Sequence, residues 1–155
     1  MDVREILKLK DNTLFTVSPN APIAEAITLM DENDIGAVVV VEGGEVVGML
    51  TFREVIAILA RRLKERYTGP TPPILEIFVH EAMYANPPLA TPEMDVDDLR
   101  RLMLDNRARY VPVMEGKTVI CVVSLRDIAK AVLEEKTLEN RVLKAYIKDW
   151  PEKES

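Results

Sequence analysis

The sequence has few of the residues that form crosslinks or metal sites. Its 155 residues include one cysteine, Cys121, and one histidine, His80. A single cysteine excludes an internal disulfide, and these two residues are too few for a metal cage of Cys and His ligands. Cys121 stands in a segment with the pattern of a strand, where we expect it to act as a small apolar residue. We predict no metal site and no catalytic cofactor.

Long apolar runs are also missing. A membrane-spanning helix needs about 18 or more consecutive apolar residues, and the sequence contains no such run. The first residues, Met1 to Glu5, lack the basic start and apolar stretch of a secretory signal. We therefore expect a cytoplasmic protein that does not bind membranes.

Positive charge is in the minority. The chain has 20 Lys and Arg residues against 26 Asp and Glu residues, which gives a net charge of −6. This balance disfavours a general attraction to nucleic acid phosphates, so we expect no nucleic acid partner. The sequence also has no Gly-rich phosphate loop and no recognisable nucleophile with its acid and base partners. We predict that the protein is not an enzyme.

What the sequence does contain is an internal repeat. At an offset of 73 residues Thr51 aligns with Ser124, and the register holds without a gap from about Leu14 to Leu59. The identical pairs include Pro19 and Pro92, Leu29-Met30 and Leu102-Met103, Asn33 and Asn106, Glu42-Gly43 and Glu115-Gly116, and Arg53 and Arg126. A repeat of this strength indicates one folding unit present twice.

Each copy predicts the same order of elements, β-α-β-β-α. An extended segment is followed by a helix with apolar residues at helical spacing, then a hairpin with a Gly-containing turn, and then a second helix. In the first copy these are residues 14–18, a helix from Ile23, a hairpin over 37–50 and a helix from Thr51; in the second they are residues 89–91, a helix capped by Asp95, a hairpin over 110–123 and a helix from Ser124. The fold class is therefore α+β.

Four segments divide the chain. We assign residues 1–66 to the first repeat, 67–78 to a connector rich in Pro and Gly, 79–136 to the second repeat and 137–155 to a C-terminal helix and tail. The connector cannot form a regular helix or a central strand. Leu138, Val142, Ala145 and Tyr146 form one stripe of the C-terminal helix, which we expect to cover apolar surface of its own module or of a partner subunit.

The strand-to-helix segments closely resemble those of the CBS-domain family. These are Gly48 to Glu54 and Cys121 to Asp127, and the segments Val3 to Leu7 and Val79 to Met83 match the short helix that leads into each CBS repeat. The resemblance covers roughly residues 3 to 135. It implies a stand-alone tandem CBS pair, or Bateman module, whose repeats pack through their sheets as a pseudo-twofold pair with two clefts. It also implies homodimers and binding of AMP, ADP, ATP or a related adenosyl ligand.

Two interpretations of Ser124 and Asp127 remain open. Asp127 could accept hydrogen bonds from ribose hydroxyls, while Ser124 and the free amides of the helix could meet a phosphate or ribose oxygen. Alternatively, the two side chains form a capping box that only satisfies the helix end. We favour binding here and capping at Thr51 and Glu54, because Glu is the residue that a capping box prefers.

Fixed positive charge favours the same cleft. Arg107 and Arg109 precede the second hairpin, at positions where family members often carry basic residues that face phosphates. The equivalent positions of the first copy hold Asp34 and Gly36, which supply no positive charge. We therefore expect the cleft that contains Asp127 to be the competent one, with solvated surface arginines as the alternative.

The resemblance places the leading segment of the first copy in this cleft as well, with Val111 and Pro112 covering the adenine. The expected ligand-binding residues are Thr13, Leu14, Phe15, Thr16, Arg107, Arg109, Tyr110, Val111, Pro112, Ser124, Arg126 and Asp127. A weaker second cleft would use Gly36, Ala37, Thr51, Arg53 and Glu54.

Two functions follow as hypotheses. The first is a regulatory module that senses an adenine nucleotide between its repeats and signals by a conformational or oligomeric change, acting on an effector protein that the sequence does not identify. AMP is the first choice of ligand, and ATP, ADP, NAD or S-adenosylmethionine are the others. The alternative is a ligand-free dimeric scaffold that docks onto a partner protein.

Overall fold

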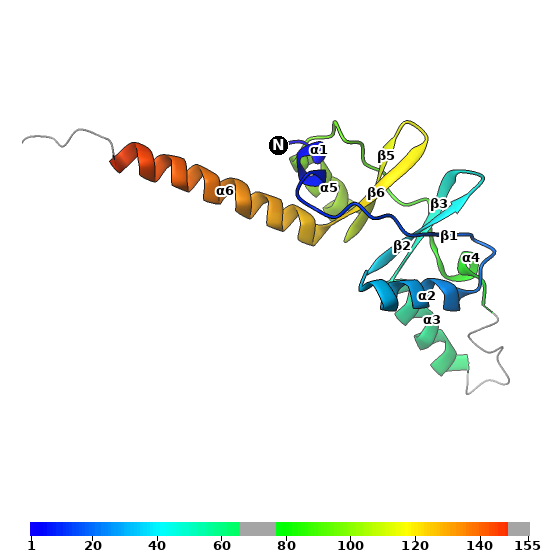
Figure 1. Cartoon of the computed structure of the whole chain (residues 1–155). Helices are drawn as coiled ribbons and strands as arrows, with labels where there is room; N and C mark the ends of the chain where they lie inside the picture. Colours follow the sequence, from blue (N-terminus) through cyan, green and yellow to red (C-terminus); the bar gives the residue numbers. More distant parts are fainter. Residues whose placement is uncertain (66–76, 149–155) are drawn as a thin grey trace, which may run out of the picture.

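A computed structural model of the chain describes residues 1–65 and 77–148 (Figure 1). The predicted connector falls outside these ranges except for Ile77 and Phe78. Trp150 and the charged tail after it also lie outside them. Within the described ranges no helix is both long enough and apolar enough to cross a membrane.

The predicted elements occur in the predicted order, and one further short strand at residues 84–85 was not predicted. The first half contains α1 (Val3–Leu7), β1 (Thr16–Val17), α2 (Ile23–Asn33), β2 (Ala37–Glu42), β3 (Glu45–Thr51) and α3 (Phe52–Glu65). The second half contains α4 (Val79–Ala82), β4 (Tyr84–Ala85), α5 (Val96–Asn106), β5 (Tyr110–Glu115), β6 (Thr118–Ser124) and α6 (Leu125–Lys148). The α+β class and the two hairpins flanked by helices are confirmed.

The strands form two sheets of unequal size. One has the order β1-β2-β3-β4 and the other consists of β5 and β6. In the first sheet β1 runs parallel to β2, with Val17 opposite Val40. The second half has a single parallel bridge between Ala90 and Val113 at the equivalent place, 73 residues further along. The extended segment predicted at 89–91 is therefore present, but only as this bridge.

Glycine sets the hairpin turns. Gly43 and Gly44 have φ angles of +58° and +81°, and Gly116 has a φ angle of +62°. Tight turns between two antiparallel strands need this left-handed backbone, which glycine adopts without a steric penalty. The turns hold β2 against β3 and β5 against β6, each with one register shift, after Val40 and after Val113.

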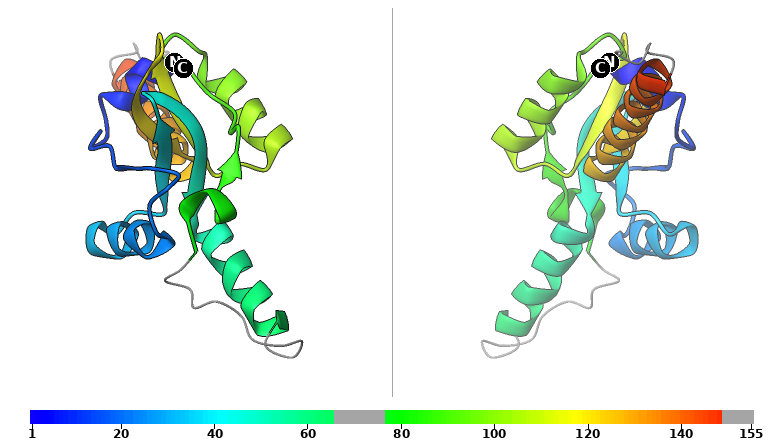
Figure 2. Two further views of the ribbon diagram at one scale, coloured as in Figure 1. Left: turned by 90° about the vertical axis from the view of Figure 1, so that its right-hand side faces the viewer. Right: turned by 90° about the vertical axis from the view of Figure 1, so that its left-hand side faces the viewer.

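The two halves pack through their sheets. Val38 and Val40 of β2 face the core of the first half, whereas Val39 between them faces the second half. This is the alternation expected of a strand that is buried on both sides. The layer between the halves contains Ala37, Val39 and Met49 of the first half and Tyr110, Val119 and Val122 of the second. Figure 2 shows the two hairpins in the middle of the module, with α2 and α5 on opposite flanks.

The leading helices are exchanged between the halves. The amide of Val3 in α1 donates to the carbonyl of Met94 at 2.9 Å, and Val3 is buried in the core of the second half. Conversely, the amide of Val79 in α4 donates to the carbonyl of Ala21 at 2.9 Å, and Val79 is buried in the core of the first half. Each core is thus completed by a segment that belongs to the other repeat.

The last helix of the structure, α6, is longer than either of the two helices that we predicted for this region. We predicted one helix from Ser124 and another from position 137, but α6 is continuous over the 24 residues from Leu125 to Lys148. The residues at the expected break, Glu134-Glu135-Lys136, contain no Gly or Pro that would interrupt a helix. Figure 1 shows the distal part of α6 extending away from the rest of the module.

Candidate functional site

A pocket of about 860 Å³ lies where the two halves meet. Its walls come from the segment between α1 and β1, from the end of α2 and the start of β2, and from the starts of β5 and α6 together with the end of β6. The first two wall segments belong to the first repeat and the others to the second. The pocket therefore exists only because the repeats pack together.

Ser124 and Asp127 form a reciprocal capping box at the start of α6. The amide of Ser124 donates to Asp127 Oδ2 at 2.8 Å, and the amide of Asp127 donates to Ser124 Oγ at 3.1 Å. The capping interpretation is thus correct for the local contacts. Both residues also line the pocket, and the second oxygen, Asp127 Oδ1, accepts no hydrogen bond from any described residue. One carboxylate can therefore cap the helix and still offer an acceptor to the pocket.

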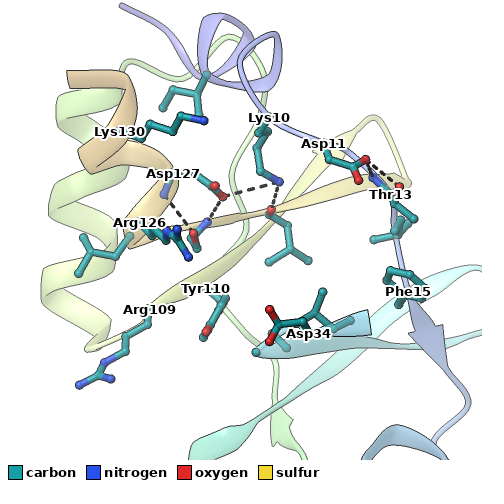
Figure 3. Close-up of a pocket in the computed structure, with 18 of the residues that line it drawn as sticks. Lys10, Asp11, Thr13, Phe15, Asp34, Arg109, Tyr110, Arg126, Asp127 and Lys130 are labelled. Carbon is teal, nitrogen blue, oxygen red and sulfur yellow. Dashed lines mark hydrogen bonds and ion pairs between the residues drawn. The ribbon is translucent and has the colours of Figure 1, made fainter. Parts of the chain in front are cut away.

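Lys10 forms an ion pair with this carboxylate and was not among the predicted site residues. Its ammonium donates to the carbonyl of Val122 at 2.8 Å and lies 3.6 Å from Asp127 Oδ2. Figure 3 shows Lys10 reaching from the segment after α1 toward the start of α6. The position of Lys10 follows from the path of an irregular segment, for which the sequence offers no pattern.

Asp11 and Thr13 lie on the same side of the pocket as Phe15 (Figure 3). The hydroxyl and the amide of Thr13 donate to Asp11 Oδ1 at 2.7 and 3.0 Å. These bonds, first that from the hydroxyl and then that from the amide, lower the pKa of Asp11, and the charge of Lys10 adds to the effect. Asp11 is therefore an anion at neutral pH and fixes the backbone of this wall.

The two candidate arginines are in different environments. Arg109 lines the pocket, as do Arg126 and Lys130 from the first turns of α6. Arg107 does not line it. This residue ends α5 in the left-handed conformation, with a φ angle of +50°, and its side chain is exposed. Lys130 was missed, although it stands one helical turn after Arg126 and this spacing places both on one helix face.

Gly36 and Ala37, which we expected in a weaker second cleft, line the pocket of Asp127. The pseudo-twofold packing brings the start of β2 against the start of β5, where the Tyr110 hydroxyl contacts Gly36. A Cβ at position 36 would collide with this hydroxyl. Glycine at position 36 therefore allows this close approach without a shift of the Tyr110 ring.

Thr13, Leu14, Phe15, Arg109, Tyr110, Ser124, Arg126 and Asp127 are the predicted residues that the structure brings together in the pocket. Besides Arg107, three others lie elsewhere. Val111 is fully buried in the core of the second half because its side chain alternates with that of Tyr110. Pro112 is buried on the strand, where its carbonyl accepts from the amide of Ala90, and Thr16 is exposed on β1. Val111 and Pro112 therefore do not form the wall that we expected.

Thr51, Arg53 and Glu54 interact locally at the start of α3. The hydroxyl of Thr51 donates to Glu54 Oε2 at 2.6 Å and accepts from the amide of Arg53 at 3.2 Å. This arrangement engages the helix end but is not the reciprocal box that Ser124 and Asp127 form. The longer Glu side chain reaches back to the hydroxyl and not to the backbone amide.

Comparison with known proteins identifies the fold. The CBS domain family model matches residues 3–61 and 79–134. The CBS domain-containing protein YhcV of Bacillus subtilis is 35% identical over 114 residues, which are 74% of this chain and 75% of YhcV. A protein with CBS domains from Burkholderia ambifaria has a solved structure with a TM-score of 0.75 and 30% identity, covering 86% of this chain and 95% of that one.

Two more distant solved structures share the fold. The CBS domain pair of protein MJ0100 was solved with 5-methylthioadenosine and S-adenosyl-L-methionine, and it matches with a TM-score of 0.72 and 22% identity over 87% of this chain and 98% of that one. CBSX2 was solved in complex with AMP, and it matches with a TM-score of 0.64 and 20% identity over 79% of this chain and 90% of that one. Two copies of the family model, related proteins of similar length and the shared fold lead to one conclusion: this chain belongs to the CBS-domain family.

Proposed function

We propose that this chain is a regulatory module that binds an adenine nucleotide in the pocket between its two repeats. The observation that carries the proposal is the combination, in one pocket, of a carboxylate with a free acceptor oxygen and four basic side chains. The carboxylate is that of Asp127, and the basic residues are Lys10, Arg109, Arg126 and Lys130. The hydroxyls of a ribose donate to a carboxylate, and a phosphate binds to basic side chains.

Apolar walls complete the chemistry. Leu14, Phe15 and Ile35 line the pocket beside these polar groups, and all three are partly buried. Such side chains suit the flat apolar face of a purine, while a few placed polar groups fix its orientation. Ligands in two neighbours of the same fold support the assignment, since CBSX2 holds AMP and the MJ0100 pair holds adenosyl compounds.

AMP fits the charge of the pocket better than ATP. Its four basic side chains stand beside three acidic ones, Asp11, Asp34 and Asp127, so the excess of positive charge is one unit. A monophosphate needs less neutralisation than a triphosphate, and additional phosphates would approach these carboxylates. We rank AMP first, with ADP, ATP, NAD and S-adenosylmethionine after it.

Signalling would follow from the position of the pocket. Because both repeats supply its walls, a bound ligand stabilises whichever arrangement of the two repeats presents the walls best. Ligand binding therefore shifts the population of arrangements and, in a homodimer, the contacts between modules. The response is read by an effector protein and involves no chemical step, so the chain is not an enzyme.

Titration calorimetry with AMP, ATP, adenosine, NAD and S-adenosylmethionine tests the proposal directly. We expect saturable binding of AMP at one site per chain, with weaker binding of adenosine. If none of the five ligands binds at millimolar concentration, the chain is not a nucleotide sensor.

A second candidate, the ligand-free scaffold, is favoured by the capping box of Ser124 and Asp127. In that function Asp127 serves only the helix end, and Lys10 neutralises it. Two measurements distinguish the candidates. A scaffold would retain a stable partner protein in a pull-down, and calorimetry would detect no binding of any nucleotide to its pocket.

A further inference from the structure

The distal part of α6, from Leu133 to Lys148, packs against no core of the described part of the chain. We call these residues the arm. Every residue of the arm is exposed, and Figure 1 shows it projecting beyond the last contacts of the module. Most of the stability of a protein helix comes from packing of its apolar face and not from helix propensity. A partner surface would therefore stabilise the helix of the arm.

Large apolar side chains continue along the whole arm. Leu138, Val142, Leu143 and Ile147 are between 54% and 62% exposed. Leu138 and Val142 are one turn apart, as are Leu143 and Ile147, so the pairs form adjoining rows on the helix. Exposed apolar surface of this extent is typical of a site where another helix or protein binds.

The charges of the arm are divided by position. Residues 133–139 contain Glu134, Glu135 and Glu139 with one lysine, a net charge of −2, whereas residues 140–148 contain Arg141, Lys144 and Lys148 and no acidic residue, a net charge of +3. Within the described ranges none of these six side chains forms an ion pair. The arm thus has one acidic half and one basic half.

This division identifies the partner and the direction of packing. A second copy of the arm laid antiparallel would put each acidic half beside a basic half, and it would do so at both ends. A parallel pair would instead place +3 beside +3 and −2 beside −2. We propose that the arm pairs antiparallel with the arm of a second copy of this chain, related by a twofold axis near its centre.

This pairing does not depend on the nucleotide pocket, because none of the arm residues lines it. Failure of ligand binding would therefore leave the arm pairing intact, and the reverse also holds. Pairing of the arms would thus join two copies through residues 133–148, outside the two packed repeats.

Variants of the full chain with one added cysteine, and a short bis-maleimide crosslinker, test the direction of packing. Glu135→Cys lies near one end of the arm and Ala145→Cys near the other. In antiparallel arms we expect a mixture of the two variants to form a crosslinked dimer, while each variant alone gives no more than the wild type, whose native Cys121 is buried. Strong crosslinking of each variant with itself would overturn the proposal in favour of parallel arms, and no crosslinking in the mixture would overturn arm pairing altogether.

Sedimentation equilibrium tests the apolar face. Val142→Asp should lower the association constant of the dimer at least tenfold and reduce the helix content measured by circular dichroism. Leu104→Asp is the matched control, since Leu104 on α5 is 76% exposed and lies outside the arm. An unchanged association constant in Val142→Asp, or an equal loss in both variants, would contradict the proposal. A wild type that sediments as a monomer at all concentrations would also contradict it.

Discussion

The ammonium of Lys10 lies 3.6 Å from Asp127 Oδ2, and the two side chains are 16% and 22% exposed. The pair joins a segment of the first repeat to the first turn of the last helix. Because water reaches both groups in part, we expect a moderate contribution of about 0.5 to 1 kcal/mol to the free energy of unfolding.

A double-mutant cycle measures this interaction. Lys10→Met and Asp127→Asn each remove one charge and keep most of the side-chain volume, and Asn retains an acceptor for the capping bond. Urea unfolding of the wild type, the two single variants and the double variant should give a coupling energy of about 0.5 to 1 kcal/mol. This coupling energy should decrease as salt is added. Strict additivity of the two single effects would show that the ion pair contributes nothing.

Asp127→Ala should weaken AMP binding at least about tenfold, which corresponds to about 1.4 kcal/mol. The variant loses the acceptor that we assign to the ribose hydroxyls. Glu54→Ala is the matched control, since Glu54 occupies the equivalent position of the first repeat and contacts Thr51. The measurement is calorimetry with AMP, after circular dichroism has shown that both variants are folded. The opposite ranking would mean that the other cleft binds the nucleotide.

Arg109→Gln should reduce the preference for AMP over adenosine several-fold, because the phosphate loses one of its cationic partners. Arg107→Gln removes the same charge two residues away, from a side chain that does not line the pocket. The ratio of the two dissociation constants, measured for each variant, isolates the phosphate contact from general effects of net charge. An equal effect of the two substitutions would indicate long-range attraction and no direct contact.

Gly36→Ala should destabilise the fold by about 1 to 3 kcal/mol, because the new methyl group meets the Tyr110 hydroxyl in the packed junction. Tyr110→Phe removes this oxygen, so the double variant should recover part of the lost stability. Thermal unfolding of the wild type, the single variants and the double variant provides the comparison. If Tyr110→Phe gives no recovery, the collision with the hydroxyl is not the cause.

Burial raises the pKa of the Cys121 thiol, and the nearby charge of Lys10 opposes this effect only in part. The unfolded chain therefore releases the thiol proton at a lower pH than the folded protein does. It follows that the free energy of unfolding is unaffected by this group at neutral pH and decreases as the pH rises through the usual thiol range. Cys121→Ala should remove this part of the alkaline destabilisation. In the wild type, alkylation at pH 8 should be at least tenfold slower in the native protein than in urea.

The sequence predicted the elements well because each depends on neighbours in the chain. The Gly turns and the cap at Asp95 are local patterns, and the structure contains both. The boundary that we expected within the C-terminal helix was wrong, because no local signal separates residue 136 from residue 137. A helix continues where nothing interrupts it.

The pocket was predicted less completely because it depends on contacts between the repeats. Ser124, Asp127 and Arg109 could be chosen from their places in a strand-to-helix pattern. Lys10 could not, since its position depends on where an irregular segment crosses the other repeat. Val111 lies in the core and not in the pocket. This could not be predicted, because the sequence does not show which face of each hairpin packs against the other hairpin.

The exchange of α1 and α4 means that neither half is a self-sufficient folding unit. A fragment that ends after α3 would carry α1 without the core that α1 covers and would lack the helix that covers its own. Two such fragments could satisfy each other by swapping their leading helices, which would rebuild the present arrangement from two identical chains. The duplicated chain thus has the topology of a domain-swapped dimer whose two subunits have been joined by a linker.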